Sequence, residues 1–463
     1  MKTQTRKNKS TKIKIDSSLP VLNTNAAGID IGHREHWCAV AANRSARPVR
    51  QLGTFTEDLQ EMATWLLACG VTSVAMEATG VYWIAAFQIL EQRGLEVRLV
   101  NARHVKNVSG PKSDVLDCQW IQRLHSFGLL NASFGPDDQV CVLRSYLRYR
   151  DQLVCARSVQ TQHMQKALQQ MNVQLHQVLS DVTGVSGLRI IEAILAGERN
   201  PEKLAGLADR RVRASRGTIA KAMKGDYRPE HLFVLHTAFA LHQTYEDKIH
   251  ACDEALIAEM AKLPARVNPQ AKPLPPRPPG RAAIRDMVAG VNLREELYRW
   301  TGVDLTAIEG IGVLTAQVVL SEIGTDMSRW RSQKHFASWL GLCPGNRISG
   351  GKVLSSHTRH VINPVADALR MSAATLKESK SALGAFYRRM RARLGAASAI
   401  TATAHRLARI VHGLLKHGQE YIRQGAEPYE QKYRERRLYN LKKNAASLGF
   451  QLTQNKEVMQ SVS

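Results

Sequence analysis

Strand-like and helix-like runs of apolar residues alternate along the chain from residue 26 to about residue 130. Short apolar runs typical of strands occur in AGIDIG, HWCAVAA, VTSVAMEATG and LEVRLVNA. Apolar residues with helical spacing occur in DLQEMATWLLACG, VYWIAAFQILEQRG and SDVLDCQWIQRLHSFG. The first two strands would form a hairpin around the polar HREH segment. This alternation predicts an α/β layer built around a mixed sheet.

The pattern changes after Pro136 and becomes helical. Residues 138–180 contain no proline, and their apolar positions lie among many arginines and glutamines. We therefore expect one long, polar helix, and its apolar stripe predicts pairing with another chain. Residues 181–260 also have helical character, although the spacing of their apolar residues is less regular.

A proline-dense segment, LPARVNPQAKPLPPRPPGR, marks the clearest domain boundary. Because proline fixes the backbone and removes an amide donor, this segment predicts a semi-rigid extended linker. The predicted organisation is a basic disordered arm at 1–25, an α/β domain at 26–137, a helical or coiled-coil region at 138–262, a proline-rich linker with a connecting helix at 263–300, a helical domain at 301–400 and a basic helical tail at 401–463.

Beyond the linker, Gly310 and Gly312 form a turn directly before an apolar helix in IEGIGVLTAQVVLSEIG. Such a turn is similar to a helix-hairpin-helix, whose exposed amides and helix dipole bind a DNA phosphate. A glycine turn can also simply join two helices. The segments YRRMRARLG and YEQKYRERRLYNLKKN are basic with interleaved tyrosines, which is typical either of nucleic-acid contacts or of a solvated helix face.

The chain of 463 residues carries a large excess of positive charge, with 64 Lys and Arg against 40 Asp and Glu. The net charge of +24 and the isoelectric point near 10.0 indicate a protein that binds a polyanion. Nucleic acid is therefore the expected partner. A ribosome-associated or merely soluble basic protein would have the same charge.

Seven scattered cysteines without a CxxC pair indicate neither a disulfide framework nor a zinc site. No apolar run approaches the ~20 residues of a membrane span. The N-terminal MKTQTRKNKSTKIKID is basic but no apolar segment follows it, so it predicts a disordered arm and not a signal peptide. These features predict a soluble cytoplasmic protein without a membrane partner.

Four carboxylates occupy positions from which they could converge. Asp30 lies between two isoleucines in the first strand, so its side chain points to the opposite face, and the flanking glycines leave room for a close approach. Glu77 ends the strand SVAME, and Asp114 and Asp117 are three residues apart on one helix face. A cluster of hard oxygen ligands is what phosphodiester chemistry with Mg²⁺ requires.

Each acid taken singly also has a structural explanation. Asp114 would favour the dipole of a helix start, Asp30 could accept hydrogen bonds from the amides of a turn, and Glu77 could pair with an arginine. The four together favour the interpretation as a metal site.

The segments GIDIG, MEATGVYW, KSDVLD and GLCPGNRISGGK occur in an order that resembles the DEDD recombinases of the insertion sequence 110 family. The form PGNRISGGK is most similar to the 1111 subgroup of that family. The resemblance covers residues 26–180 and 305–395. It implies a RuvC-like domain of RNase H fold at 26–137, with Asp30, Glu77, Asp114 and Asp117 as its acidic tetrad, and a C-terminal transposase domain.

The resemblance also implies that Ser349 is a catalytic nucleophile. A hydroxyl in a glycine-rich segment can approach a phosphate closely, and Arg347, Lys352 and Arg359 could supply positive charge to it. Without the resemblance, Ser349 would be less favoured, and Ser355 and Ser356 would compete with it. His357 and His360 could transfer protons, although ordinary polar contacts are expected of them.

The implied function is that of an insertion-sequence transposase that exchanges DNA strands through a covalent phosphoserine, with Mg²⁺ or Mn²⁺ as cofactor. The implied partners are an element-encoded guide RNA, donor and target DNA, and further copies of the chain in a tetramer. It would act in the bacterial cytoplasm at the nucleoid. Two alternatives stay open: a metal-only RuvC-like nuclease or DDE-type transposase with an inert Ser349, and a non-catalytic nucleic-acid-binding protein.

Overall fold

The computed structural model describes residues 20–78, 80–100, 114–130, 135, 137–274, 286–419, 435, 438–439 and 441–451. Most of the predicted basic arm, part of the proline-rich linker and much of the predicted tail lie outside these residues. The chain divides into two compact units, which are unit 1 at Met1–Gly135 and unit 2 at Pro136–Ser463.

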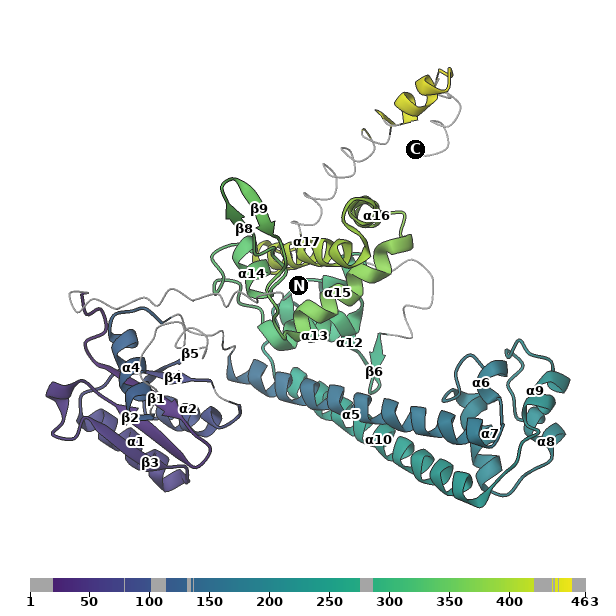
Figure 1. Cartoon of the computed structure of the whole chain (residues 1–463), viewed down its shortest axis with the longest axis horizontal. Coiled ribbons are helices and arrows are strands. Elements are labelled where there is room, and N and C mark those ends of the chain that lie inside the picture. Colours follow the sequence, from purple (N-terminus) through teal and green to yellow (C-terminus); the bar gives the residue numbers. More distant parts are fainter. Residues whose placement is uncertain are drawn as a thin grey trace, which may run out of the picture. The chain divides into compact units, whose positions relative to one another are not determined.

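A five-stranded mixed sheet forms the centre of unit 1 (Figure 1). Its strands are β1 (Ala26–Ile31), β2 (Glu35–Ala39), β3 (Val49–Gly53), β4 (Ser73–Glu77) and β5 (Glu96–Val100). Their order in the sheet is β3-β2-β1-β4-β5, with β3, β2 and β1 antiparallel and β1, β4 and β5 parallel. The predicted mixed α/β layer and the hairpin of the first two strands are confirmed. Strand β3 was not predicted.

Helices cover both faces of this sheet. One face packs on α1 (Thr56–Ala68) and α2 (Trp83–Gln92), which were both predicted, and buries Ile29 and Met76 in the larger core. The other face packs on α4 (Asp114–Ser126) and buries a smaller core around Ala75. Because strand residues alternate between the faces, Val74 and Met76 of β4 belong to the larger core and Ala75 to the smaller one.

Two helices of 33 residues each, α5 (Asp138–Gln170) and α10 (Pro229–Ala261), lie side by side in unit 2 (Figure 1). The Arg150 guanidinium binds both carboxylate oxygens of Asp253, at 2.5 and 3.1 Å, and Leu153 is buried against α10. A long helix was thus predicted correctly from residue 138, but it ends at Gln170 and not at 180, and its apolar stripe packs against α10 of the same chain. The pattern could not identify this partner, because an amphipathic stripe shows only that a helix is covered.

The chain between these two helices forms a small helical lobe. Its helices are α6 (Leu175–Val178), α7 (Val185–Leu195), α8 (Pro201–Gly206) and α9 (Arg216–Ala222). They enclose a core with the adjoining ends of α5 and α10, in which Met164, Ile190 and Leu235 are fully buried. The lobe is therefore the packed end of the α5–α10 pair.

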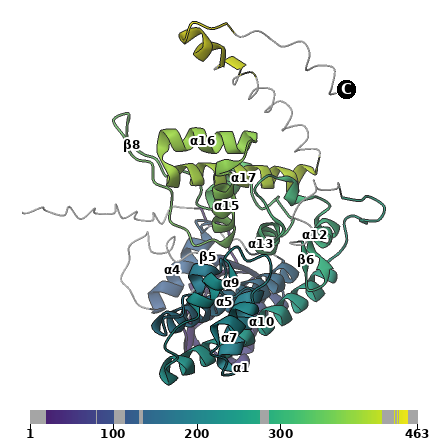
Figure 2. The ribbon, with the colours of Figure 1, turned by 90° about the vertical axis from the view of Figure 1, so that its right-hand side faces the viewer.

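The C-terminal part of unit 2 is a helical assembly with one short β-hairpin, beside the small β6 (Met287–Val288) and β7 (Val291–Asn292) pair. Its helices are α12 (Leu293–Thr301), η2 (Leu305–Ala307), α13 (Val313–Ile323), α14 (Gln333–Trp339), α15 (Pro364–Thr375), η3 (Leu376–Glu378), α16 (Ala382–Leu394) and α17 (Ala396–His417). Helix α17 packs on α14, and on α15 and α16, which Figure 2 shows beside it. The predicted boundary between domain and tail at residue 400 falls inside α17.

A buried ion pair network joins α5 to α13 in this assembly. Glu322, which is 4% exposed, accepts hydrogen bonds from Arg148 at 2.8 and 2.9 Å and pairs with the Nε of Arg144 at 3.2 Å. Hydrogen bonding to Glu322 raises the pKa of Arg148, whereas burial lowers the pKa of Arg144. The carboxylate therefore partly neutralises the charge of two guanidinium groups in the N-terminal part of α5.

Candidate active site

Asp30 and Glu77 are neighbours at the ends of two adjacent parallel strands. The register pairs Ile29 of β1 with Met76 of β4, so the next residues along the strands are these two acids. Ile29 and Met76 point into the core under α1 and α2, and strand alternation places Asp30 and Glu77 on the opposite face, toward α4. Both acids are half-buried. The predicted convergence of two carboxylates at strand ends is consistent with this register.

Gly28 brings α4 into direct contact with β1. A Cβ atom built on Gly28 would lie 2.2 Å from the backbone nitrogen of Gln122 and 2.5 Å from the carbonyl oxygen of Cys118. The side-chain amide of Gln122 also donates a hydrogen bond to the carbonyl of Ala26, at 3.3 Å. The expected close approach beside Asp30 is thus made by the backbone of a helix, and only glycine permits it.

Asp117 directly precedes Cys118, whose carbonyl oxygen takes part in this contact. The pKa of the intervening Cys118 thiol is raised to about 12, chiefly by burial and in addition by the negative charges of Asp30 and Asp117. Both carboxylates therefore lie within electrostatic range of one sulfur atom in the contact between β1 and α4. All four predicted acids thus belong to one face of the sheet or to α4, the helix that covers it.

Asp114 is the first residue of α4, but its side chain lies outside the described residues. Its backbone position, three residues before Asp117, puts both on one helix face. Within the described part of the chain, no three acids, histidines or cysteines are close enough to hold a metal ion. The donor chemistry nevertheless fits Mg²⁺ or Mn²⁺, because the candidate ligands that lie near this contact are carboxylate oxygens.

Ser349 lies at the tip of a hairpin formed by β8 (Arg347–Ser349) and β9 (Lys352–Ser355). It pairs with Lys352 across the two-residue turn Gly350-Gly351, whose φ angles are +54° and +76°. Positive φ at both turn positions is the geometry that glycine adopts without strain, as in type I′ hairpins. The glycine-rich segment is therefore an ordered two-residue turn, and the serine beside it is exposed.

The polar neighbours of Ser349 are largely solvent-exposed. Lys352 is exposed, and the side chain of Arg347 lies outside the described residues. Arg359 donates a hydrogen bond to the carbonyl of Ser338 in α14, at 3.1 Å. Ser355, a competing candidate, is half-buried and its hydroxyl accepts a hydrogen bond from the backbone of His357 at 3.4 Å. The remaining candidates, Ser356, His357 and His360, are exposed.

The glycine turn before α13 has two different glycines. Gly310 has a φ of +86°, and a Cβ there would lie 3.1 Å from the carbonyl of Ser372, so it serves tight packing. Gly312 precedes the first turn of α13 and has open space where a Cβ would be. The element before the turn is the short 3-10 helix η2, where the predicted helix-hairpin-helix would have a full helix.

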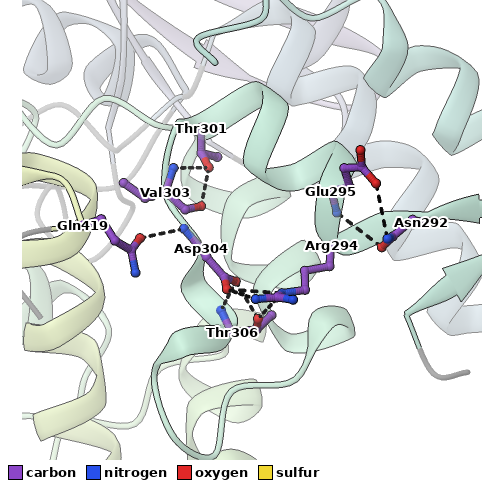
Figure 3. Close-up of polar contacts among 8 residues, drawn as sticks. All are labelled: Asn292, Arg294, Glu295, Thr301, Val303, Asp304, Thr306 and Gln419. Atoms are coloured by element: carbon purple, nitrogen blue, oxygen red, sulfur yellow. Dashed lines mark hydrogen bonds and ion pairs between the residues drawn. The ribbon is translucent and has the colours of Figure 1, made fainter. Parts of the chain in front are cut away.

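A buried ion pair holds η2 against α12 below this turn (Figure 3). The guanidinium of Arg294 donates to Asp304 at 2.6 Å, and Asp304 accepts a hydrogen bond from the backbone of Thr306 at 2.9 Å. The backbone of Asp304 donates to the side-chain oxygen of Gln419, at 2.9 Å. This network was not predicted from the sequence. The only indication in the sequence was an arginine and an aspartate of opposite charge ten residues apart.

Two family models match separate parts of the chain. The model of a DEDD transposase of the IS110 type matches residues 27–173, which include all four acids. A second model, described as the transposase of the IS116/IS110/IS902 family, matches residues 303–388, which include Ser349. The chain belongs to the IS110 family of transposases. No match was found among curated proteins.

Membership in the IS110 family establishes a DNA transposase, and DNA is accordingly a partner. A DEDD transposase domain also implies a divalent metal ion as cofactor. The excess of positive charge agrees with this polyanionic partner. In the described part of this transposase, no helix is long and apolar enough to cross a membrane.

Proposed function

We propose that this transposase cuts and rejoins DNA at a two-part site, with Asp30, Glu77, Asp114 and Asp117 from a RuvC-like domain of RNase H fold and Ser349 from the C-terminal domain. The observation that carries the proposal is the register of β1 and β4, which gives Asp30 and Glu77 one face under α4. The four acids would hold Mg²⁺ or Mn²⁺. The bound ion would neutralise phosphate oxygens and stabilise the charge on the leaving oxygen.

Ser349 is the proposed nucleophile. Its Oγ atom would attack the phosphorus of a DNA phosphodiester, so that one bond from Oγ to phosphorus forms while the bond from phosphorus to a sugar oxygen breaks. The serine proton ends on the released sugar hydroxyl, through solvent. A hydroxyl from the exchanged strand then reverses these steps and releases the serine. Because one phosphoester bond replaces another, no nucleoside triphosphate is consumed. In agreement with this, the sequence contains no GxxxxGK[ST] phosphate loop.

The exposed position of Ser349 at a hairpin tip supports this role, because a phosphodiester in a DNA strand can reach it there. Lys352 and Arg347 in the same hairpin, and Arg359 after it, would bind the phosphate backbone. The turn at Gly310 and Gly312 would offer the N-terminus of α13 to another phosphate.

The proposal also includes how the DNA target is selected. We place the chain in the 1111 subgroup and infer that an element-encoded RNA pairs with donor and target DNA, while the protein forms a tetramer at the nucleoid. The four acids and Ser349 belong to different units, so the two units must meet, within one chain or between chains. Sequencing of the RNA that co-purifies tests this inference. Random cellular RNA in place of one species from the DNA flanking the gene would contradict it.

The nucleophile is tested with Ser349→Ala and its matched control Ser356→Ala, which alters an exposed serine just beyond the hairpin. We expect Ser349→Ala to lower strand exchange by several orders of magnitude and to abolish covalent protein–DNA adducts on denaturing gels, while DNA binding is retained. Cleavage that persists without an adduct would instead identify the metal-only nuclease or DDE-type reaction.

The metal site is tested with Asp117→Asn and the control Glu91→Gln, an exposed acid on α2. We expect Asp117→Asn alone to abolish cleavage, because it removes one anionic ligand. Unchanged activity would remove Asp117 from the site. Binding of DNA without Mg²⁺-dependent cleavage by the unaltered protein would favour a non-catalytic role. Mixing Asp117→Asn with Ser349→Ala protein restores activity only where different chains supply the two parts.

A further inference from the structure

A cavity of about 330 Å³ lies among α14, α16 and α17, apart from the residues assigned above. Its walls include the side chains of Gln333, Phe386, His405, Arg406 and Arg409. Its volume is at the small end of the roughly 300–1,000 Å³ typical of ligand sites. Figure 2 shows α16 and α17 next to each other on the side of the assembly away from α5 and α10.

The walls of this cavity are positively charged. Arg406 and Arg409 belong to α17, and both line the cavity, whose described walls contain no Asp or Glu. The two helices that supply most of the walls, α16 and α17, carry seven Lys and Arg residues and no Asp or Glu between residues 382 and 417. Such a local excess of cations attracts a polyanion.

The aromatic ring of Phe386 contacts two of these arginines. The guanidinium carbon of Arg406 lies 5.1 Å from the ring centroid, and that of Arg389 lies 5.6 Å from it. A guanidinium over an aromatic face is attracted by the ring quadrupole, which favours one orientation of its plane. Phe386 is half-buried, so its own position is fixed by packing between α16 and α17.

His405 and Gln333 add neutral hydrogen-bonding groups to the same walls. Burial, followed by the charge of Arg409, lowers the pKa of His405, so its ring is neutral at physiological pH. A neutral imidazole and an amide can each donate one hydrogen bond to an oxygen without adding charge. Two guanidinium groups with neutral donors beside them are the side chains that proteins use to bind phosphate.

We propose that this cavity binds a backbone phosphate of a nucleic-acid strand, with Arg406 and Arg409 as the charged contacts and Phe386 as the residue that positions Arg406. The site is distinct from the residues proposed for chemistry, and it depends only on the family assignment, under which DNA is a partner. A strand held there would be bound by its backbone, without reading of its bases.

The proposal is tested with the full chain and short labelled oligonucleotides of single-stranded DNA, duplex DNA and RNA, by fluorescence anisotropy over a salt series. We expect Arg409→Gln and Arg406→Gln each to weaken binding about tenfold. Each substitution should also reduce the slope of log affinity against log salt by about 1, as for one lost phosphate contact. The polymer with the largest loss identifies whether DNA or RNA occupies the site.

Arg393→Gln is the matched control, because Arg393 is an exposed arginine of α16 that does not line the cavity. Equal losses for Arg393→Gln and Arg409→Gln would overturn the proposal, since they would show only the general effect of net charge. Arg409 is exposed, so its substitution leaves the packing of α17 intact, which far-UV circular dichroism checks.

Phe386 is tested separately as a positioning residue. Phe386→Leu should weaken binding about as much as Arg406→Gln, and Phe386→Tyr, which keeps the ring, should restore it. The double variant Phe386→Leu with Arg406→Gln should be no weaker than Arg406→Gln alone, because both changes remove one contact. Additive losses, or a Phe386→Leu variant with unchanged affinity, would contradict the positioning role.

Discussion

Asp30 and Glu77 stand on the central strands of a sheet that carries helices on both faces, whereas Ser349 stands at the tip of a two-stranded hairpin. Both acids are half-buried, and the backbone of α4 touches the strand of Asp30 at Gly28. The serine is exposed, and its hairpin neighbours Ile348 and Leu354 are 62% and 68% exposed. The two parts of the proposed site therefore differ in how firmly the fold holds them.

This difference matches the demands on each part. Ligands of a divalent ion have to be held to within a fraction of an ångström, which requires packed elements. A nucleophile that attacks a large, incoming polymer has to be accessible, and an exposed hairpin with few buried contacts opens at low free-energy cost. Substitutions should therefore affect stability strongly around the acids and weakly around the serine.

The strongest effect is expected at Gly28. Gly28→Ala should destabilise unit 1 by about 3 kcal/mol or more, because the new methyl group overlaps backbone atoms that cannot rotate away. Urea unfolding measures this, and DNA cleavage should be lost with it. Gly217→Ala in α9 is the control, since its Cβ would meet open space and alanine favours a helix. A Gly28→Ala protein as stable as the control would refute the account of the contact between β1 and α4.

A second effect should appear as pH dependence, through His125 of α4. Its ring hydrogen-bonds the hydroxyl of Ser73 in β4 at 2.8 Å, and burial, followed by the charge of Arg98, lowers its pKa to about 4. Unfolded histidine titrates near 6.5, so the contribution of His125 is complete above pH 6.5 and is lost as the pH falls toward 4. The free energy of unfolding should fall by about 3 kcal/mol at most over this range.

Hydrogen exchange of the α4 amides between pH 6.5 and 4 measures this loss. His125→Gln should reduce the pH dependence of α4 stability. His163→Gln, at an exposed position of α5, should leave that pH dependence unchanged. His36 of β2 also has a lowered pKa, chiefly through burial, so part of the pH dependence should persist in His125→Gln. An identical slope in both variants would show that His125 does not tie α4 to the sheet as described.

The smallest effect on stability is expected in the serine hairpin. Gly350→Ala places a Cβ at a positive φ, which costs about 1–2 kcal/mol locally, but no atoms lie within 4 Å of it. Global unfolding of unit 2 should therefore hardly change, while the position of Ser349 and the rate of strand exchange should. The measurement is the unfolding midpoint beside the exchange rate. A large shift of the midpoint would mean that the hairpin is part of the packed structure.

Much of unit 1 could be predicted from the sequence because its signals are local. The alternation around Asp30 and the apolar run before Glu77 were sufficient to predict two strands, the face of Asp30 and the place of Glu77 at a strand end. The role of Gly28 was predicted only as room for a close approach, since no local pattern identifies which segment approaches. Strand β3 was missed, because its sequence VRQLG has little apolar character.

Unit 2 was predicted less completely, because its decisive contacts join distant residues. The partner of α5 begins more than fifty residues after α5 ends, and the pair Arg150–Asp253 spans over a hundred. The serine hairpin, in contrast, had a local signal, since Gly-Gly between short runs with apolar residues is typical of a two-residue turn. It was treated only as a glycine-rich segment at the level of sequence, because Ser-Gly-Gly also occurs in ordinary loops.

The pairing of α5 with α10 has a geometric consequence for the lobe at their far end. A helix of 33 residues is about 50 Å long, so the chain travels that distance from the C-terminal assembly to the lobe and then returns. The length of this arm can change without rerouting the chain, provided that both helices change together. Removing seven residues from each, which is close to two turns, would draw the lobe about 10 Å inward while nearly preserving the facing sides.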